Sequence, residues 1–467
     1  MAARTRASTE EVNENTMQYN KPISFRTVCL TGALITATAF ADDRRDWPQF
    51  RGPQGNGIAS MESAPVEITQ ANTVWKTPMP GKGWSSPVHS QGHIWLTTAE
   101  TAAASEAQLA KKRQGVDFAQ MKTAAGHARF RAICIDARSG SIKHNIQLLD
   151  LKDPELIHAL NSYASPTPAI QGDRVVFHFG SYGTWCLNLT TGEQLWKQTS
   201  LVVDHSVGPG SSPVIAKDTV LLVYDGIDEQ FVAGVDLATG KPKWRTKRPP
   251  MRATNGEYRK AYSTPLIIDV AGQTQAVIPG AQWMCGYDPT SGKELWRADC
   301  GDGFSTTPMA VYDSGVVVCS TGFMQPQLVA VDPKGSGDVT DSIVWKSRNG
   351  GTTMPTAVAA DGAIFSMDEK GRLTIVSSTT GEMLARARVG GNFSSSPLLA
   401  AGRLYVGSRE GVLSVYALEK LDGKYREPKL LARNKLDGDL MASPAVLGSD
   451  FIIRTSKSLM RVTPEKP

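Results

Sequence analysis

Residues 210–244 read GSSPVIAKDTVLLVYDGIDEQFVAGVDLATGKPKW, and this stretch contains one complete unit of the repeat that decides the fold. The unit begins with a small-residue turn that ends in proline. It continues through a dense apolar run at Val220–Tyr224 and a turn at Asp236–Gly240, and it closes on Trp244. Short apolar runs bounded by turn residues are typical of β-strands. The unit therefore predicts four strands joined by tight turns.

The proline turn occurs eight times along the chain, and consecutive prolines are 79, 47, 52, 43, 47, 42 and 47 residues apart. The copies are WSSP at Trp84–Pro87, YASP at Tyr163–Pro166, GSSP at Gly210–Pro213, YSTP at Tyr262–Pro265, FSTTP at Phe304–Pro308, TTMP at Thr352–Pro355, FSSSP at Phe393–Pro397 and MASP at Met441–Pro444. Four strands in about 40 to 50 residues are typical of a propeller blade, and ring closure hides the sheet edges. The sequence predicts an all-β, eight-bladed β-propeller of four-stranded antiparallel blades.

The two ends of the repeat array are predicted to share one blade. The last unit, Met441–Val462, ends without a fourth strand, whereas Thr73–Lys76 has the composition of that strand and precedes the first unit. We therefore expect the N-terminal strand to close the last blade. The long first interval holds a polar insertion in blade one, at about residues 100–129, where Ser105 and Gln108 predict a capping-box helix start. This insertion is either a solvated decoration or a long loop with a binding role.

The first 41 residues differ in composition from the rest. Lys21 and Arg26 precede an uncharged stretch at 27–40, and Ala39-Phe40-Ala41 fits a signal-peptidase site. We therefore expect residues 1–41 to be a signal peptide and residues 42–467 to be a periplasmic or secreted propeller. Translation from Met17 is an alternative to Met1, and an uncleaved anchor is an alternative to cleavage. After cleavage we expect no integral membrane domain, and a monomer.

Composition and cysteine usage narrow the function classes. The formal net charge is only +5, and no run of basic residues is interleaved with aromatics, so we expect no nucleic-acid partner. The six cysteines become five when Cys29 leaves with the signal peptide, so at least one thiol stays unpaired. Cys134, Cys186 and Cys285 each precede a turn in successive units, which favours buried strand positions over disulfides or metal ligands.

Residues that precede the proline turns lead into the innermost strands, so we expect their side chains to surround one mouth of the central channel. The set mixes aromatic and polar groups, as small-molecule and peptide sites do. The predicted ligand-binding residues are Trp84, Asn161, Tyr163, His205, Arg259, Tyr262, Phe304, Asn392, Phe393 and Asp439. The alternative for the aromatic residues is that they fill the channel as core.

A weaker candidate is a metal site that combines His205 with Asp225 and Asp228. Histidine and carboxylates are common ligands, but the chain has no motif with ligand spacing around these residues. The alternative is that the two aspartates shape a turn.

The chain resembles the PQQ-like (pyrroloquinoline-quinone-like) β-propeller repeat family. The resemblance rests on DWPQFRGPQGNG at Asp46–Gly57, on the repeated TG-x-x-x-W turns and on GGNFSSSP at Gly390–Pro397, and it extends to the C-terminus. These motifs are similar to those of the uncharacterised exported bacterial branch. The family also includes quinone-dependent alcohol dehydrogenases and the propeller lipoprotein of the β-barrel assembly machinery. The resemblance implies that the tryptophans pack one blade against the next.

Two functions follow from the resemblance. The first is a non-catalytic binding or assembly scaffold, without catalytic residues, that takes a protein, peptide or glycan ligand at the cell envelope. The alternative is a PQQ-dependent oxidoreductase with a divergent site, whose tryptophan would be Trp84 or Trp283. Related dehydrogenases stack the quinone between a tryptophan and a disulfide of adjacent cysteines and hold calcium with carboxylates and amides. This chain has no adjacent cysteines. No cofactor is therefore predicted, and PQQ with calcium stays the alternative.

Overall fold

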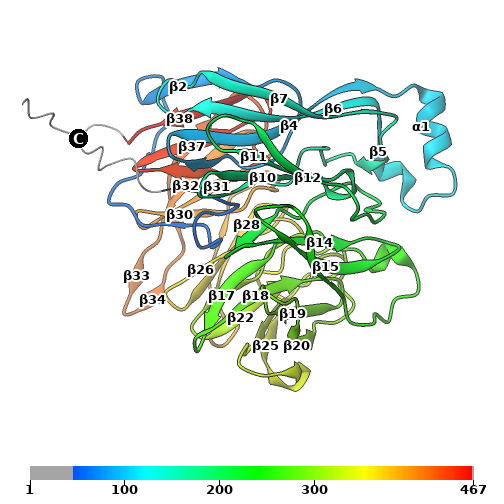
Figure 1. Ribbon diagram of the computed structural model, residues 1–467. Coiled ribbons are helices and arrows are strands. Elements are labelled where there is room, and N and C mark those ends of the chain that lie inside the picture. The colour runs from blue at the N-terminus through cyan, green and yellow to red at the C-terminus, as the bar shows by residue number, and fades with distance from the viewer. Residues whose placement is uncertain (1–45, 465–467) are drawn as a thin grey trace, which may run out of the picture. The chain divides into compact units, whose positions relative to one another are not determined.

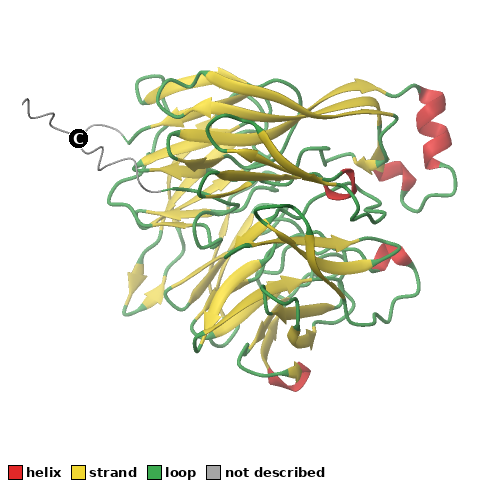
Figure 2. Ribbon diagram, viewed as in Figure 1, coloured by secondary structure: helices red, strands yellow, loops and turns green. Residues whose placement is uncertain are grey.

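The short apolar runs of the repeat form strands that hydrogen-bond in order within eight separate antiparallel sheets. The computed structural model describes residues 46–464, and these residues form an eight-bladed β-propeller, as the sequence predicts (Figure 1). Strands dominate the described chain and helices are few and short (Figure 2). The predicted signal peptide at 1–41 and the choice between Met1 and Met17 fall outside the described residues.

Each blade begins with its innermost strand, and several innermost strands contact the innermost strand of a neighbouring blade. The innermost strands are β3 (Val88–Ser90), β9 (Ala169–Gln171), β13 (Val214–Ala216), β17 (Leu266–Val270), β21 (Val311–Asp313), β26 (Val358–Ala360), β30 (Leu398–Ala400) and β36 (Ala445–Leu447). The second strands are β4 (His93–Ala103), β10 (Arg174–His178), β14 (Thr219–Asp225), β18 (Gln273–Pro279), β22 (Val316–Ser320), β27 (Ala363–Met367), β31 (Arg403–Gly407) and β37 (Asp450–Arg454). Most second-strand residues are buried, because blades cover both faces.

The two outer strands of each blade complete the sheet. The third strands are β6 (Ala125–Asp136), β11 (Thr184–Asn188), β15 (Gln230–Asp236), β19 (Trp283–Tyr287), β23 (Leu328–Val331), β28 (Arg372–Ser377), β32 (Val412–Ala417) and β38 (Ser458–Val462). The fourth strands are β7 (Ile142–Lys152), β12 (Gln194–Gln198), β16 (Pro242–Lys247), β20 (Glu294–Asp299), β25 (Ile343–Ser347), β29 (Met383–Arg388), β35 (Lys429–Lys435) and β2 (Thr73–Pro78).

The propeller closes through its N-terminal strand. Strand β2 pairs antiparallel with β38, so that Lys76 lies opposite Met460 and Pro78 opposite Ser458. This pairing confirms the prediction that the N-terminal strand completes the last blade. Opening the ring therefore requires the loss of a full strand pairing.

At four of the eight junctions, a tryptophan of the outer strand docks one blade onto the next. Trp196 of blade two donates its Nε1–H to the carbonyl oxygen of Leu237 in blade three, at 2.8 Å, and its ring covers Gly240. Trp75 of β2, the outer strand of blade eight, docks onto blade one in the same way. It donates its Nε1–H to the Ala137 carbonyl oxygen at 3.1 Å, and its ring covers Gly140. A Cβ atom at Gly240 would lie 2.5 Å from the ring, and φ there is +70°, so the turn requires glycine.

A second set of contacts links the blades around the channel. At seven of the eight junctions, the residue two positions before an innermost strand donates its backbone N–H to a side-chain hydroxyl at the equivalent position of the next blade, at 2.9–3.0 Å. We call these hydroxyl residues the hydroxyl ring: Ser86, Thr167, Ser212, Thr264, Thr356, Ser396 and Ser443. The eighth position is Met309, whose side chain accepts no hydrogen bond; at that junction Ser263 Oγ instead donates to the Pro308 carbonyl, at 2.9 Å.

Comparison with the hydroxyl ring shows that the proline of the turn does not occupy the same position in every blade. In five blades the proline directly precedes the innermost strand, as Pro213 precedes β13. Pro166, Pro308 and Pro355 instead stand three residues before β9, β21 and β26. The hydrogen bonds between blades, and not the proline, therefore define the equivalent positions.

Residues 46–59, which we call the N-terminal plug, cross the channel. Trp47 forms a two-hydrogen-bond bridge with His89 of blade one, Gly55 faces Leu266 and Met309 of blades four and five, and β1 (Ile58–Ala59) pairs with β30 of blade seven. Buried Arg51 donates to the carbonyl oxygens of Thr356 and Ala357 in blade six. The plug thus closes one end of the channel.

The insertion in blade one forms a structured cap. Strands β4 and β6 extend beyond the blade and carry α1 (Glu106–Arg113), η1 (Ala119–Met121) and β5 (Lys122–Thr123) (Figure 1). The predicted capping box is present, because Ser105 and Gln108 exchange side-chain and backbone hydrogen bonds. Strand β5 pairs with β8 (Ile157–His158), which precedes blade two. We call residues 104–124 the cap.

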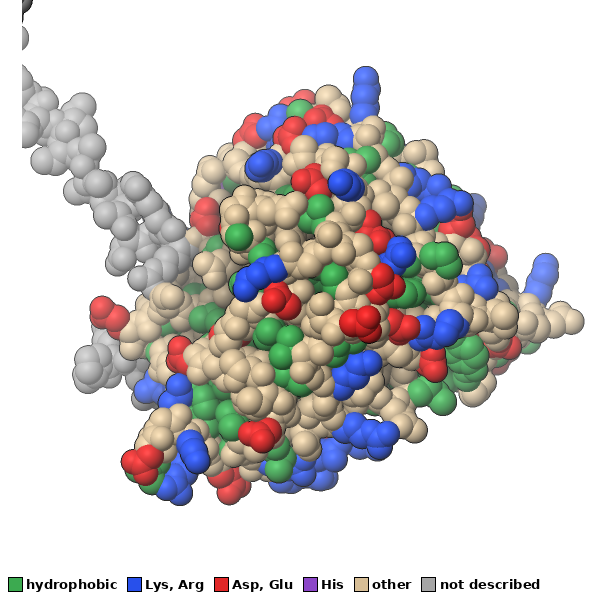
Figure 3. All heavy atoms as spheres, turned by 90° about the horizontal axis from the view of Figure 1, so that it is seen from below, with side chains coloured by type: hydrophobic (Ala, Val, Ile, Leu, Met, Phe, Trp, Pro, Cys, Tyr) green, Lys and Arg blue, Asp and Glu red, His purple; other side chains and the backbone are tan. Residues whose placement is uncertain are grey.

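The remaining elements are short. They are β24 (Gly337–Asp338), β33 (Lys420–Leu421), β34 (Lys424–Tyr425), η2 (Gly180–Tyr182), η3 (Gly256–Tyr258) and η4 (Thr340–Ser342). Within residues 46–464, no helix has the length and apolar character needed to cross a membrane. On the face seen in Figure 3, basic and acidic side chains alternate.

The five cysteines of the described chain are free thiols, and all are buried. Cys134, Cys186 and Cys285 lie in third strands, which confirms their prediction as buried strand residues. Burial raises the pKa of each of these three thiols to about 12. The Sγ atoms of Cys300 and Cys319 lie 4.0 Å apart.

Ring closure through β2 makes a direct stability prediction. Trp75→Ala should lower the free energy of unfolding by about 3 to 5 kcal/mol, because it removes a buried aromatic ring that docks two blades. Val74→Ala, on the exposed face of the same strand, should change it by less than about 0.5 kcal/mol. Urea unfolding of both variants measures the difference. Equal effects would contradict the docking role of Trp75.

Candidate functional site

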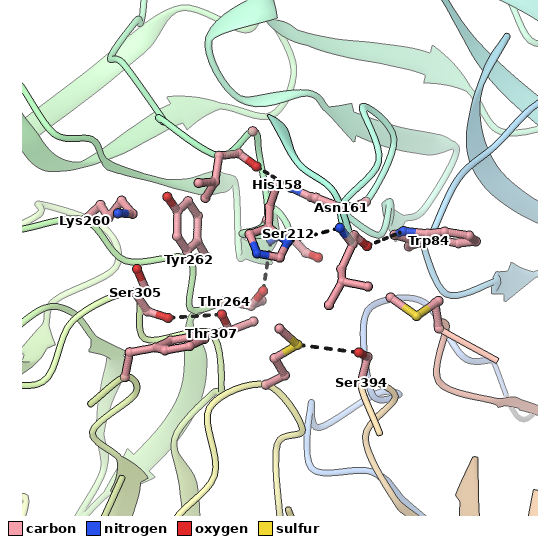
Figure 4. Close-up of a pocket in the computed structure, with 18 of the residues that line it drawn as sticks. Trp84, His158, Asn161, Ser212, Lys260, Tyr262, Thr264, Ser305, Thr307 and Ser394 are labelled. Carbon is pink, nitrogen blue, oxygen red and sulfur yellow. Dashed lines mark hydrogen bonds between the residues drawn. The ribbon is translucent and has the colours of Figure 1, made fainter. Parts of the chain in front are cut away.

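A cavity of about 420 Å³ lies on the channel axis, and residues from all eight blades line it. Figure 4 shows part of this lining. Its floor consists of the hydroxyl ring together with Phe50 of the N-terminal plug. Its opposite side carries Phe118, Met121 and Lys122 of the cap. The plug and the cap thus convert an open channel into a pocket with one closed end.

The walls and the entrance of the cavity are largely apolar. Aromatic and methionine side chains form the walls, and they are those of Trp84, Phe304, Phe323, Met354 and Met441. Trp84 is fixed by a hydrogen bond of 2.9 Å from its Nε1–H to the Leu160 carbonyl. Large apolar side chains at the entrance stay exposed to solvent: Phe118 by 42%, Met121 by 44%, Leu160 by 39% and Met324 by 78%. Exposed apolar groups around a pocket are typical of a binding surface.

One wall holds a buried ionic group, which we call the lysine–glutamate cluster: Lys122, Ser206, Glu257 and Lys260. Lys122 Nζ lies 2.9 Å from Glu257 Oε1 and 2.8 Å from Ser206 Oγ, while Lys260 Nζ binds Glu257 Oε2. The Ser206 hydroxyl donates to Glu257 Oε1 at 2.6 Å. Both lysines and the glutamate are almost fully buried. The cluster joins the cap to loops that precede blades three and four.

The pKa values of this cluster follow from burial and hydrogen bonding. Burial alone would raise the pKa of Glu257, but hydrogen bonds from Lys260, Ser206 and Lys122 outweigh it, so the net pKa lies below the ordinary value. Burial lowers the pKa of Lys260, and the Glu257 hydrogen bond opposes that shift. Glu257 is therefore a carboxylate at neutral pH.

His158 presents a hydrogen-bond donor to the cavity. Its Nδ1 accepts the backbone N–H of Leu160 at 3.1 Å, so the neutral ring carries its proton on Nε2. Figure 4 shows the imidazole among the lining residues. Burial, followed by the positive charges of Arg409, Lys260 and Lys122, lowers the pKa of His158. The ring is therefore neutral at physiological pH.

The structure brings together four of the ten residues that the sequence places at the channel mouth. Trp84, Asn161, Tyr262 and Phe304 line the cavity. Asn161 Nδ2 donates to the Val207 carbonyl at 2.9 Å, so this side chain also braces the wall.

Three of the remaining six residues are buried beside the cavity and do not line it. Tyr163 donates its hydroxyl hydrogen to the Glu155 carbonyl at 2.8 Å. His205 stacks on Tyr224, with ring centroids 6.3 Å apart. Phe393 packs within the apolar core of blades six and seven.

The other three residues lie nearer the surface. Arg259 donates to the Ala253 carbonyl at 2.7 Å, and Asn392 donates to Glu410 Oε1 at 2.8 Å. Asp439 is exposed and lies outside the cavity lining.

Both aspartates of the candidate metal site have other partners. Both carboxylate oxygens of Asp225 bind the guanidinium of Arg248, at 3.0 and 2.7 Å. Asp228 Oδ1 accepts the backbone N–H of Asp204 at 2.8 Å. Burial lowers the pKa of His205 to about 4. Across residues 46–464, no group of three or more His, Cys, Asp or Glu side chains is arranged to hold a metal ion.

Sequence reasoning missed the lysine–glutamate cluster and His158. Lys122 and Glu257 are 135 residues apart, and no motif surrounds either residue. The hydroxyl ring did leave a signal, because Ser or Thr recurs beside the proline turns.

A closed ring of eight blades with a pocket on its axis defines an eight-bladed β-propeller. The family profile that matches the chain is of the PQQ-like repeat class. The chain belongs to the family described as "Outer membrane protein assembly factor BamB", whose profile matches residues 66–278 and 327–426. Among curated proteins, none matches the sequence of this chain.

Solved structures with the same fold include an assembly factor and enzymes. The structure of BamB from Moraxella catarrhalis is 14% identical, with a TM-score of 0.53, over 85% of this chain and 98% of that chain. Quinohemoprotein alcohol dehydrogenase from Comamonas testosteroni is 12% identical, with a TM-score of 0.58, over 92% and 83% of the two chains. A europium-containing methanol dehydrogenase is 10% identical, with a TM-score of 0.58, over 89% of each chain. At these identities the likeness concerns the fold alone.

The residues of the cavity do not fit PQQ with calcium. Glu257 is the sole carboxylate among the described lining residues, and both of its oxygens are engaged by lysines. Both ends of the Asn161 side-chain amide already have partners. Its Nδ2 donates to the Val207 carbonyl oxygen, and its Oδ1 accepts from the Ser162 backbone N–H and the Ser165 hydroxyl. No pair of adjacent cysteines exists to stack on a quinone.

The lysine–glutamate cluster predicts a pH-dependent stability difference. Glu257→Gln should destabilise the protein at pH 7 by about 3 to 5 kcal/mol, because two buried ammonium groups lose their carboxylate. A carboxyl group with a lowered folded pKa stabilises the fold above its ordinary pKa, and this contribution is lost as the pH falls through the folded value. The difference between wild type and variant should therefore shrink on acidification. Denaturant unfolding at pH 7 and pH 3 measures this stability difference. A difference that does not change with pH would contradict the role of Glu257 as the buried carboxylate of the cluster.

Proposed function

We propose that this protein is an exported, non-catalytic binding scaffold of the cell envelope, which takes a protein, peptide or glycan ligand at the capped mouth of the channel. The observation that carries the proposal is the preformed cavity, which has a rigid floor, an apolar wall and an exposed apolar entrance. Export rests on the composition of residues 1–41, and an envelope role rests on the family to which the chain belongs.

The state of the cavity side chains supports binding over catalysis. A general base or nucleophile needs a free, suitably tuned group near the substrate. Glu257 is held by two lysines and a serine, and the pKa of His158 lies below its ordinary value. No cysteine is among the described lining residues. The polar groups are therefore suited to holding a ligand in place.

The exposed apolar side chains at the entrance of the cavity favour a partner that presents an apolar group. Phe118 and Met121 come from the cap, Leu160 from the segment before blade two, and Met324 from the loop between β22 and β23 of blade five. These side chains are partly exposed, and completing their burial would recover part of the about 1.5 to 3 kcal/mol that full burial of such a side chain provides. A bound partner would recover that free energy.

A double variant of the entrance tests the binding role. Phe118→Asp with Met324→Asp places two charges at the entrance, where a bound apolar group would have to desolvate them. We expect native mass spectra of wild-type protein, isolated from its own host without dialysis, to show a bound mass that the double variant lacks. Val344→Asp, at an exposed apolar site on outer strand β25, is the matched control and should keep the bound mass. A bound mass retained by the double variant would place the ligand elsewhere.

A titration separates the scaffold from the oxidoreductase alternative. We expect PQQ with calcium to give no saturable quenching of tryptophan fluorescence. Trp84 lines the cavity, whereas Trp283 lies outside it and donates its Nε1–H to the Pro250 carbonyl at 2.9 Å. Saturable quenching that disappears in Trp84→Phe but persists in Trp283→Phe would contradict the scaffold proposal and favour the enzyme.

A further inference from the structure

We infer that the cavity binds a ligand with a single carboxylate on an apolar body. The inference rests on the proposed binding function and goes further, because it names the chemistry of the ligand. Three features of the cavity carry it: a floor of hydrogen-bond donors, a wall with an excess of positive charge, and apolar surroundings.

The floor offers one O–H donor, beside one remaining lone pair, from each hydroxyl of the hydroxyl ring. Each of the seven hydroxyls of the hydroxyl ring accepts a backbone N–H from the preceding blade. A Ser or Thr hydroxyl that accepts in this way still has one O–H to donate. Among the described residues, none of these seven O–H groups has a protein acceptor, although all seven side chains are at least nine-tenths buried. They can donate only to what occupies the cavity.

The wall carries more positive than negative charge. The lysine–glutamate cluster holds two ammonium groups and one carboxylate, and these are the charged side chains in the described lining. Asp117 also lies close enough to favour the charged form of Lys260, but it is exposed to solvent and hydrogen-bonds to Asn255. A buried charge without a partner is costly, so the wall favours one additional anionic group.

His158 adds a neutral donor on the same cavity. Its Nε2–H has no partner among the described residues, and its lowered pKa keeps the ring uncharged. A carboxylate suits these donors because it accepts several hydrogen bonds and supplies one negative charge. A neutral sugar would leave the excess charge unpaired. A compound with several carboxylates would bring more negative charge than the wall can pair.

The remaining surface limits the size and character of the ligand. Trp84, Phe304 and the methionines at 354 and 441 offer apolar contacts, and the volume of about 420 Å³ is that of a small-molecule pocket. The body that carries the carboxylate is therefore apolar and of a size that fits a small-molecule pocket.

Two probes with one body and different charge test the inference. Isothermal titration compares 1-naphthaleneacetate with its neutral counterpart 1-naphthaleneethanol, using the full-length mature protein. We expect the acid to bind at least about tenfold more tightly than the alcohol, because only the acid has a buried charge partner. Lys122→Met and Lys260→Met should each remove this preference.

A matched control separates a cavity effect from a general loss of positive charge. Lys243→Met removes a lysine that pairs with Asp218 at 2.9 Å on outer strand β16, away from the cavity. This variant should keep the full preference for the acid. If the lysine variants of the cluster do not fold, His158→Phe is the substitute, because its ring is only half-buried and makes one hydrogen bond. The His158→Phe variant should weaken the binding of the acid more than the binding of the alcohol.

The possible outcomes distinguish the inference from the proposed function. Equal binding of acid and alcohol at the cavity, unchanged by the lysine variants, would overturn the carboxylate inference and leave the binding function standing. Binding of neither probe would count against both. Acetyl-phenylalanine and its amide extend the test to the end of a peptide chain. Preference for the peptide acid over 1-naphthaleneacetate would support the carboxylate and identify a chain terminus as its source.

Discussion

The hydrogen bond from a backbone N–H of one blade to a hydroxyl of the next is the constraint on which the rest of the structure depends. It recurs at seven of the eight junctions around the channel, at 2.9–3.0 Å, and it fixes the height of each blade relative to its neighbours. Each hydroxyl that accepts this bond keeps its O–H free to donate, and all seven hydroxyl residues line the cavity. One interaction therefore both aligns the blades and determines the chemistry of the cavity floor.

Two segments outside the repeat turn this framework into a site. The N-terminal plug crosses the channel and contributes Phe50 to the floor, while the cap contributes Lys122 and two apolar side chains to the opposite side. Lys122 also ties the cap to Ser206 and Glu257, so the cap is held by buried hydrogen bonds. The insertion is consequently part of the cavity lining.

The sequence predicted the fold because each blade depends on local signals. The proline turns, the apolar runs and the glycine turns recur, and the incomplete last unit pointed to the N-terminal strand as its partner. The cavity was harder to predict, since it depends on contacts between distant segments such as Lys122 and Glu257. Tyr163 and Phe393 precede inner strands, as Trp84 does, but their side chains point into the core. Side-chain direction depends on the register of each turn, which the proline did not define.

The most direct measurement of the central claim is a crystal structure of the protein purified from its own host without dialysis. The account predicts electron density for a ligand between the hydroxyl ring and the cap, with oxygen atoms within hydrogen-bond distance of a ring hydroxyl and of His158 Nε2. A cavity that contains only water, with ligand density at another part of the propeller, would contradict it.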